Sequence, residues 1–327
     1  MTKGSRWLIT GGAGFIGSAL AWELNERGQE KIVLADRLGN SEKWRNLLPL
    51  RFEDMVDADD LLPGLEQDKY GEFSHILHMG ACSSTTETDA SWLLRNNYAY
   101  SCRLAEWAHS HGSRFLYASS AATYGAGENG MEDSTACLPL LRPLNLYGYS
   151  KHIFDVWMTN KSWLDSAVGV KFFNVFGPNE EHKEDMRSLV HKAFHQVQED
   201  GAVRLFRSHR EEWQDGCQTR DFLWIKDAVK MVLHLAQSDC SGLFNLGSGE
   251  ARTWNDLANA VFYAMDREPN IEYIDMPEIL REKYQYHTEA NIQRLRNSGW
   301  QQAATPLEDA VADYVCNYLA KNRRLGD

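Results

Sequence analysis

A glycine-rich turn close to the start of the chain constrains the fold more than any other feature. The apolar run 6–10 leads into TGGAGFIGS, in which Gly11, Gly14 and Gly17 are spaced G-x-x-G-x-x-G. Glycines at this spacing after a strand let the backbone approach a pyrophosphate, which then lies at the N-terminus of the next helix. Asp36 ends the following apolar run, about 20 residues further on, where a carboxylate can accept from a ribose hydroxyl. The pattern therefore predicts a dinucleotide-binding βαβ unit.

Apolar runs and segments of helical period alternate along the first half of the chain. The runs typical of buried strands are 6–10, 31–36, 74–80, 114–118 and 168–174, and the helical segments are 15–27, 89–111 and 150–164. Because strands that alternate with helices form parallel sheets, we expect an α/β fold of Rossmann type with a doubly wound parallel sheet.

This alternation changes after residue 174, where the sequence enters a polar loop with Gly and Pro. Beyond the loop we expect helices near 185–199, 226–237, 253–265 and 306–322, with strand-like runs within 219–247 and at 271–276. The sequence thus predicts two domains with soft boundaries. The dinucleotide-binding domain comprises residues 1–173 plus about 219–250, and a smaller, mixed α/β substrate-binding domain comprises about 174–218 plus 251–327.

The composition argues against several classes of protein. The 327 residues include 46 acidic and 34 basic side chains, a net charge of -12, and such a surface repels nucleic acid and anionic lipid. No apolar stretch approaches the roughly 20 residues that span a bilayer. Residues 1–5 leave no room for a secretory signal before the first apolar run. We therefore expect a soluble, cytoplasmic protein that binds neither nucleic acid nor membrane.

The six cysteines are scattered through the chain and lack the spacing of a metal site. They stand at positions 82, 102, 137, 217, 240 and 316. For a cytoplasmic protein of this size we expect free, buried thiols and no bound metal.

The loop after the second apolar run bears on the choice between NADP and NAD. Asp36 favours NAD, because a carboxylate suits the 2′-hydroxyl of its ribose. Arg37 and Lys43 favour NADP, because cations can neutralise a 2′-phosphate. A solvated charged loop would have the same composition. The sequence favours NADP and leaves NAD open.

A second motif, NLYGYSK, points to proton transfer. Tyr147 and Lys151 are four residues apart, so on a helix both side chains lie on one face, and the lysine is expected to lower the pKa of the tyrosine. Such a phenol can exchange a proton with a substrate hydroxyl. Ser120, at the end of a predicted strand, can hold the same oxygen. Tyr149 is the rival tyrosine, but Ile153 occupies the position where its lysine would stand.

The motifs together resemble the extended short-chain dehydrogenase/reductase superfamily and, within it, the ADP-L-glycero-D-manno-heptose 6-epimerase family. The similarity extends over nearly the whole chain. It rests on HMGACSSTTE (78–87), RNNY (95–98), FLYASSAATYG (115–125), LNLYGYSK (144–151), FFNVFGPNEEHK (172–183) and FNLGSG (244–249).

The resemblance implies roles for particular residues. Ser120 and Tyr147 match the family's catalytic pair, Lys151 matches the lysine that binds the nicotinamide ribose, and Lys183 matches a second acid/base. The implied cofactor contacts are Gly11, Gly14, Phe15, Ile16, Gly17, Asp36, Arg37, Lys43, Met79, Gly80, Ala81, Cys82, Ser83, Asn96, Lys151, Val175 and Lys183. The implied sugar-nucleotide contacts are Asn174, Asp185, Lys192, Phe206, Arg207, Ser208, His209, Arg220 and Tyr284.

Three of these assignments have alternatives on the residues alone. Lys183 lies in EEHKED, and its residues alone favour a solvated lysine in a charged loop; only the resemblance favours the acid/base role. Arg207 and Arg220 can form surface ion pairs with neighbouring acids instead of binding a diphosphate. The chain also departs from some members, which have Glu in place of Met79 and Asn in place of Arg37. Its segment 207–220 is longer than in those members, so its individual ligands are unsettled.

The resemblance implies an NADP-dependent isomerase that inverts C6 of the heptose in ADP-D-glycero-D-manno-heptose. The carbon would be oxidised transiently to a ketone and reduced on its other face, and the product would serve lipopolysaccharide core biosynthesis. The family also implies one tightly bound cofactor per subunit and a homo-oligomer. The alternatives are another nucleotide-sugar epimerase, such as a UDP-hexose 4-epimerase, and a non-catalytic dinucleotide-binding protein on the same fold.

Overall fold

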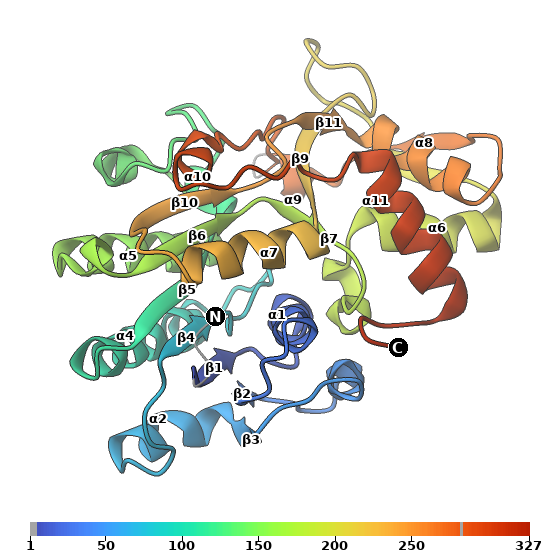
Figure 1. The fold of residues 1–327 in the computed structure, drawn as a ribbon. Coiled ribbons are helices and arrows are strands. Elements are labelled where there is room, and N and C mark those ends of the chain that lie inside the picture. The colour runs from blue at the N-terminus through green and yellow to red at the C-terminus, as the bar shows by residue number, and fades with distance from the viewer. Residues whose placement is uncertain (1–4, 282–283) are drawn as a thin grey trace.

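Seven parallel strands form the central sheet of the computed structural model, which describes residues 5–281 and 284–327 (Figure 1). Their order is β10-β6-β5-β4-β1-β2-β3. The strands are β1 (Trp7–Thr10), β2 (Ile32–Asp36), β3 (Asp54–Asp57), β4 (His75–His78), β5 (Arg114–Ser120), β6 (Val168–Phe172) and β10 (Gly242–Leu246). The chain runs outward from β1 through β2 to β3 and then crosses back to β4 on the other side of β1. The strand order therefore reverses at β1, which opens a crevice at the carboxyl ends of these strands.

Helices cover both faces of this sheet. The core on one face includes α1 (Phe15–Glu26) and α7 (Ile225–Ala236). The core on the other face includes α2 (Ala58–Glu66), α4 (Tyr100–Ser110) and α5 (Leu146–Asn160). Every residue of β1, β2, β6 and β10 is buried, as expected for strands covered on both faces. The expected α/β fold of Rossmann type is confirmed.

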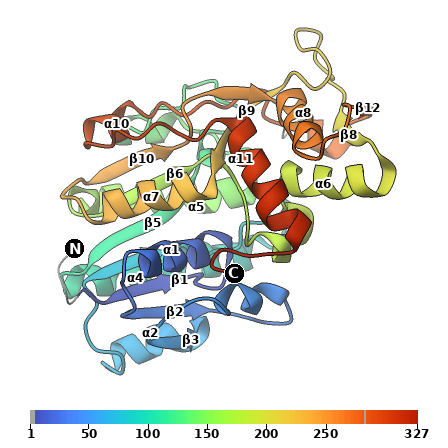
Figure 2. The same ribbon diagram turned by 45° about the vertical axis from the view of Figure 1, so that its right-hand side comes forward.

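A smaller group of elements lies beside the carboxyl ends of the strands (Figure 2). β7 (Asn174–Phe176), β9 (Thr219–Trp224) and β11 (Ala251–Thr253) form a three-stranded mixed sheet, and β8 (Val203–Phe206) pairs with β12 (Ile271–Ile274). The helices around them are α6 (Leu189–Asp200), α8 (Trp254–Ala264) and α11 (Leu307–Asp313). Short helices are α3 (Ala90–Leu93), α9 (Glu278–Arg281) and α10 (Gln293–Asn297).

The structure differs from the sequence-based elements in several places. The run 168–174 is divided, because β6 ends at Phe172 in the large sheet and β7 begins at Asn174 in the small one. The helical segment 89–111 is interrupted by a π-helical stretch, Leu94–Ala99, and the segment 306–322 by another, Tyr314–Tyr318. No sequence pattern predicted β3, α2, β8, β11, α9 or α10.

The six cysteines are free, as expected, but the expectation that they are buried is wrong. Five are partly exposed and Cys316 is exposed. Cys102 and Cys240, for example, pack against a core from its margin and remain partly accessible. Within the described residues, no helix combines the length and apolarity that crossing a bilayer requires.

Candidate active site

A cavity of about 980 Å³ lies at the carboxyl ends of the central strands, where the small group of elements faces the large sheet. It brings together most of the residues predicted from the sequence. The predicted residues that line it are Gly11, Gly14, Phe15, Ile16, Gly17, Asp36, Lys43, Met79, Gly80, Ala81, Ser83, Tyr147, Lys151, Asn174, Val175, Lys183, Lys192, Phe206 and Tyr284. Those that do not line it are Arg37, Cys82, Asn96, Ser120, Asp185, Arg207, Ser208, His209 and Arg220.

The glycine turn after β1 is a cradle that no side chain could enter. Gly11 has a φ of +67°, and a Cβ there would lie 2.8 Å from the Cα of Gly80. A Cβ on Gly17 would lie 2.0 Å from the carbonyl oxygen of Gly11. Helix α1 follows directly, with no side-chain cap on its first N–H groups and no acidic residue in its first turn. These features fit the pyrophosphate of a dinucleotide, whose charge the helix N-terminus stabilises.

The two side chains that follow β2 are held differently. Asp36 accepts from the backbone N–H of Ala13 at 2.9 Å and from Lys43 Nζ at 2.7 Å, so its charge is neutralised within the cavity. Arg37 points elsewhere, since it donates to Asp59 at 2.9 and 3.0 Å and to Asn96 Oδ1 at 2.7 Å. This pair of ions is exposed, with 45% of the Arg37 side chain accessible, so it can open at little cost.

Helix α5 presents the proton-transfer pair. It starts after Asn145, whose side chain accepts from the N–H of Gly148 at 2.8 Å, and this cap places Tyr147 and Lys151 on the face that lines the cavity. Ser120 does not itself line the cavity; it acts through a hydrogen bond with the Tyr147 hydroxyl. The rival Tyr149 is 47% exposed on the outer face of the helix.

The predicted lowering of the Tyr147 pKa by Lys151 is wrong for this structure. Burial raises the pKa of Tyr147, although the hydrogen bond with Ser120 acts in the opposite direction. Lys151 instead donates to the carbonyl oxygen of Ala118 at 2.8 Å. Burial lowers the pKa of Lys151 to about 8, and the Asp155 carboxylate opposes this shift.

Lys183 faces the cavity from the loop between β7 and α6. Its Nζ lies 5.1 Å from the centre of the Phe15 ring, at the beginning of α1. Burial lowers the pKa of Lys183, and the neighbouring Glu180 carboxylate raises it. Glu180 is itself fixed by the backbone N–H of Ser188 at 2.7 Å and its hydroxyl at 2.6 Å. The alternative of a fully solvated lysine is therefore wrong.

Aromatic side chains form the far end of the cavity. Phe222, Trp254 and Tyr284 line it, and the Trp254 indole N–H donates to the Tyr284 hydroxyl at 2.8 Å. Behind them lies Arg220, which is 6% exposed and whose guanidinium carbon is 5.5 Å from the Trp254 ring and 5.1 Å from the Tyr284 ring. Arg207 instead forms an exposed ion pair with Asp275 at 3.6 Å, as its alternative predicted.

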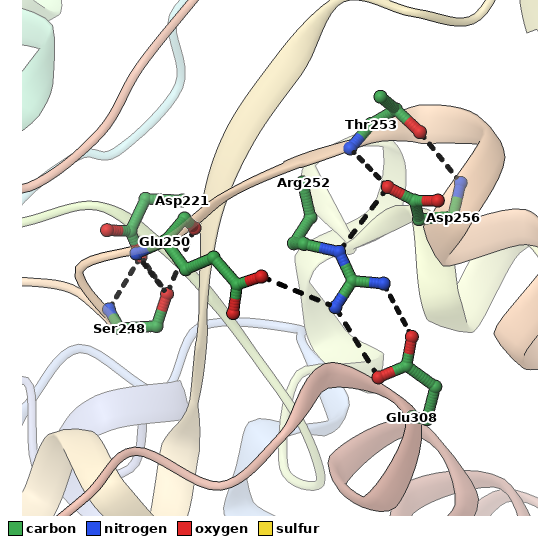
Figure 3. Close-up of polar contacts among 7 residues, drawn as sticks. All are labelled: Asp221, Ser248, Glu250, Arg252, Thr253, Asp256 and Glu308. Atoms are coloured by element: carbon green, nitrogen blue, oxygen red, sulfur yellow. Dashed lines mark hydrogen bonds and ion pairs between the residues drawn. The ribbon is translucent and has the colours of Figure 1, made fainter.

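Polar contacts around β9 and β11 set the position of this aromatic wall (Figure 3). The buried Asp221 carboxylate accepts from the N–H of Ser248 at 2.6 Å and of Ala290 at 3.0 Å, which ties β9 to two other segments. Thr253 and Asp256 form a reciprocal capping box, with N···O distances of 2.9 and 3.0 Å. Because the cap starts α8 at Trp254, it determines where that ring enters the cavity.

Sequence reasoning missed part of the lining. The sequence assigned no role to any of the eleven tryptophans, although Trp254 lines the cavity. No feature of the sequence around Trp254 distinguishes it from a tryptophan that packs in the core. The missed polar residues are Ser84, Thr85, Ser119, His182, Arg187, Ser188, Gln196 and Arg204. Arg187 and Gln196 stand near Lys192 in the sequence, and a helical projection of this segment would have placed Lys192 and Gln196 on one face.

Comparison with known proteins identifies the family. Residues 7–247 match the NAD dependent epimerase/dehydratase family. The chain belongs to this family. The ADP-L-glycero-D-manno-heptose-6-epimerase of Nitratidesulfovibrio vulgaris (strain DP4) is 52% identical over 316 residues, covering 96% of this chain and 98% of that protein. The enzyme of the same name from Fusobacterium nucleatum is 43% identical over 325 residues, covering 96% and 98%.

A solved structure agrees with these relatives. The crystal structure of Helicobacter pylori ADP-L-glycero-D-manno-heptose-6-epimerase superposes with a TM-score of 0.79 at 28% identity, covering 97% of this chain and 96% of that one. The expected resemblance to heptose 6-epimerases is confirmed, as is the expectation of an epimerase of the isomerase class. Family membership also supports the expected nicotinamide dinucleotide cofactor.

Proposed function

We propose that this epimerase inverts C6 of the heptose in ADP-D-glycero-D-manno-heptose, giving ADP-L-glycero-D-manno-heptose, with NADP as its cofactor. The observation that carries the proposal is the presence of two proton-transfer groups, Tyr147 and Lys183, on different elements of one cavity. Relatives named for this activity at 52% and 43% identity support the choice of substrate. The product would enter lipopolysaccharide core synthesis in the cytoplasm, and the enzyme would work as a homo-oligomer.

The two ends of the cavity suit the two ligands. The large sheet would hold the dinucleotide, and the small group of elements, to which β9 (Thr219–Trp224) belongs, would hold the sugar nucleotide. An adenine ring can stack on Trp254 or Tyr284. Arg220 has no carboxylate partner among the described residues, so its charge remains available to attract a diphosphate.

Inversion through a ketone requires hydride transfer on both faces of C6, and a proton is exchanged at the hydroxyl oxygen in each configuration. A bound nicotinamide dinucleotide would supply the hydride acceptor and donor for C6, with the keto sugar turning between oxidation and reduction. Tyr147, assisted by Ser120, would exchange the proton of the hydroxyl in one configuration, and Lys183 that of the other. Because burial lowers the pKa of Lys183, its neutral form is easier to reach than that of an exposed lysine.

The activity is tested by incubating purified protein with ADP-D-glycero-D-manno-heptose, without added cofactor, and following the configuration at C6 by NMR. We expect inversion to an equilibrium mixture. UDP-glucose and UDP-N-acetylglucosamine serve as competing substrates in the same assay. The proposal fails if the heptose substrate binds without inversion, or if C4 of a UDP-hexose is inverted instead.

The choice of NADP predicts a selective effect of Arg37. Its ion pair with Asp59 is exposed, so the guanidinium can turn to a 2′-phosphate beside Lys43. A charge-assisted hydrogen bond contributes about 1.5–3 kcal/mol, so Arg37→Ala should weaken NADP binding roughly 10- to 100-fold. The affinity for NAD should stay within about twofold, because NAD has no phosphate for Arg37 to bind. Isothermal titration of protein freed of cofactor measures both; equal losses for the two cofactors would contradict the assignment.

The diphosphate subsite predicts a role for Lys192. This lysine lines the cavity, and within the described part of the chain its side chain donates to the backbone carbonyl of Asp185, at 2.6 Å, rather than to a carboxylate. Lys192→Met should raise KM for the sugar nucleotide about 10- to 100-fold with little change in kcat, because it removes an ionic contact present throughout the reaction. Lys161→Met is the control, since that lysine stacks on Trp157 and Trp163 instead. An unchanged KM for Lys192→Met would remove Lys192 from the subsite.

A further inference from the structure

A buried ion pair joins α5, the helix that carries Tyr147 and Lys151, to strand β6. Asp155 on α5 and Lys171 on β6 are 0% and 1% exposed, and Lys171 Nζ is 2.6 Å from Asp155 Oδ2. Among the ion pairs of the described residues, this one alone has both side chains so completely buried. Removing two charges from water is costly, and apolar side chains would fill the same space without that cost. The pair therefore needs a reason beyond packing.

The pair is connected to the strand that ends in the catalytic serine. Asp155 accepts from the hydroxyls of Tyr117 at 2.9 Å and Ser119 at 2.8 Å, both on β5. Lys171 Nζ donates to Thr123 Oγ1 at 2.7 Å. The Thr123 hydroxyl in turn donates to the backbone carbonyl of Ser120 at 2.8 Å, so a continuous chain of hydrogen bonds ends at the residue that contacts Tyr147.

The same pair is connected to the catalytic lysine. Asp155 stands four residues after Lys151, one helical turn along the same face of α5. The Asp155 carboxylate raises the pKa of Lys151 against the effect of burial. Lys151 also interacts with His78, which ends β4, and with the Cys82 thiol, which lies in the loop after β4. Of these neighbours, Asp155 is the carboxylate.

We propose that Asp155, Lys171 and Thr123 are positioning residues that hold Ser120 and Lys151 in register across β5 and α5. The pair fixes the strand end through Thr123 and keeps Lys151 protonated through the charge of Asp155. None of the three lines the cavity, so they act through Ser120 and Lys151 rather than on substrate. The inference rests on the proposed function of Ser120, Tyr147 and Lys151, and it accounts for two buried charges that this function leaves unexplained.

The hydroxyl of Thr123 gives the cleanest test, because it can be removed without changing charge. Thr123→Val keeps the shape but loses both hydrogen bonds, and Thr123→Ser keeps them. We expect Thr123→Val to lower kcat for epimerisation about 10-fold, with KM and bound cofactor within about twofold of wild type. Thr123→Ser should restore kcat to within about threefold.

Tyr124→Phe is the matched structural control. It removes a buried hydrogen bond to Asn245 Oδ1, of 2.6 Å, from the neighbouring residue without touching Ser120 or Lys151. The Tyr124→Phe variant should have the kcat of wild type, even if its melting temperature falls by as much as that of Thr123→Val. The inference is overturned if Thr123→Val retains full kcat, or if the Val, Ser and Tyr124→Phe variants lose activity in proportion to stability.

The charge of Asp155 is tested on the protein itself, without substrate. Lysine side-chain NMR, with the Lys151 signal assigned by its loss in Lys151→Met, reports the pKa of Lys151. Removing a negative charge makes protonation less favourable, so Asp155→Asn should lower this pKa by roughly one unit and Thr123→Val should leave it unchanged. An unchanged pKa in Asp155→Asn overturns the charge role.

Outcomes for the inference and for the proposed function are separable. Asp155→Asn leaves Lys171 as a buried, unpaired cation and can prevent folding; in that case Lys171→Met/Asp155→Leu, which removes both charges, takes its place in the NMR measurement. Failure of wild-type protein to invert the heptose contradicts the proposed function alone, since the pKa measurement still decides the role of Asp155. Activity of wild type with an unchanged Thr123→Val contradicts the inference alone.

Discussion

Replacing Tyr147 by Phe is expected to lower kcat for epimerisation by about 10²- to 10⁴-fold, the usual contribution of a positioned acid/base. The Phe ring fills the same space on α5, so the helix and the cavity should keep their shape. The hydroxyl is lost, and with it the hydrogen bond to Ser120 and the proton exchanged with substrate. Bound nicotinamide dinucleotide should remain, because the glycine turn and Lys151 are unchanged. Steady-state NMR assays and the absorbance of the bound cofactor measure the two quantities.

The raised pKa of Tyr147 also predicts the direction in which the rate of epimerisation changes with pH. Burial raises the pKa of Tyr147, so the deprotonated form grows only on the alkaline side, and a wild-type rate limited by this group should rise with pH. That rise should be absent in Tyr147→Phe. Tyr149→Phe, two residues along on the exposed face of the same helix, should keep the wild-type rate and profile. If Tyr147→Phe retained more than about a tenth of wild-type kcat, the proton-transfer assignment would be wrong.

The fold followed from the sequence wherever an element had a local signal. The glycine turn and the apolar runs of β1, β2, β4, β5 and β6 are continuous in the sequence, and the structure places them in one sheet. β3 and α2 had no such signal. β3 reads DMVD and only Val56 is buried, because it is an edge strand, and α2 contains Pro63. Edge strands are short and charged for physical reasons, so apolar runs cannot reveal them.

The site residues, like the elements of the fold, were predictable only where a local sequence pattern fixes their relation. Tyr147 and Lys151 were found because four-residue spacing on a helix fixes their relation, and the structure keeps it. Arg220 and Arg207 look alike in sequence, yet one lies buried behind an aromatic wall and the other forms a surface ion pair. The raised pKa of Tyr147 depends on burial by distant segments, which spacing does not contain. The spacing of residues on one helix was predictable from the sequence, whereas their burial, ion pairs and pKa shifts depend on the tertiary structure.

Replacing Lys183 is expected to have the second large effect on kcat. Which substitutions slow the reaction tests its role more specifically than the size of the loss. Lys183→Met should lower kcat for interconversion by about 10²- to 10⁴-fold, because one configuration at C6 loses its acid/base. Lys183→Arg should be nearly as slow, since the charge at the Phe15 ring is kept but a guanidinium does not give up its proton. Both variants should bind substrate with KM within about fivefold of wild type.

The two acid/base variants should be complementary when each epimer is tested alone. In single turnovers, Lys183→Met should still reduce the bound cofactor with the epimer served by Tyr147, and Tyr147→Phe with the epimer served by Lys183. The absorbance of the reduced nicotinamide records each half-reaction. Because Tyr147 comes from α5 and Lys183 from the loop before α6, opposite preferences would show that the two elements act on different configurations of one carbon. The same preference in both variants would contradict a two-base mechanism, and full activity of Lys183→Met would return that residue to a role in binding.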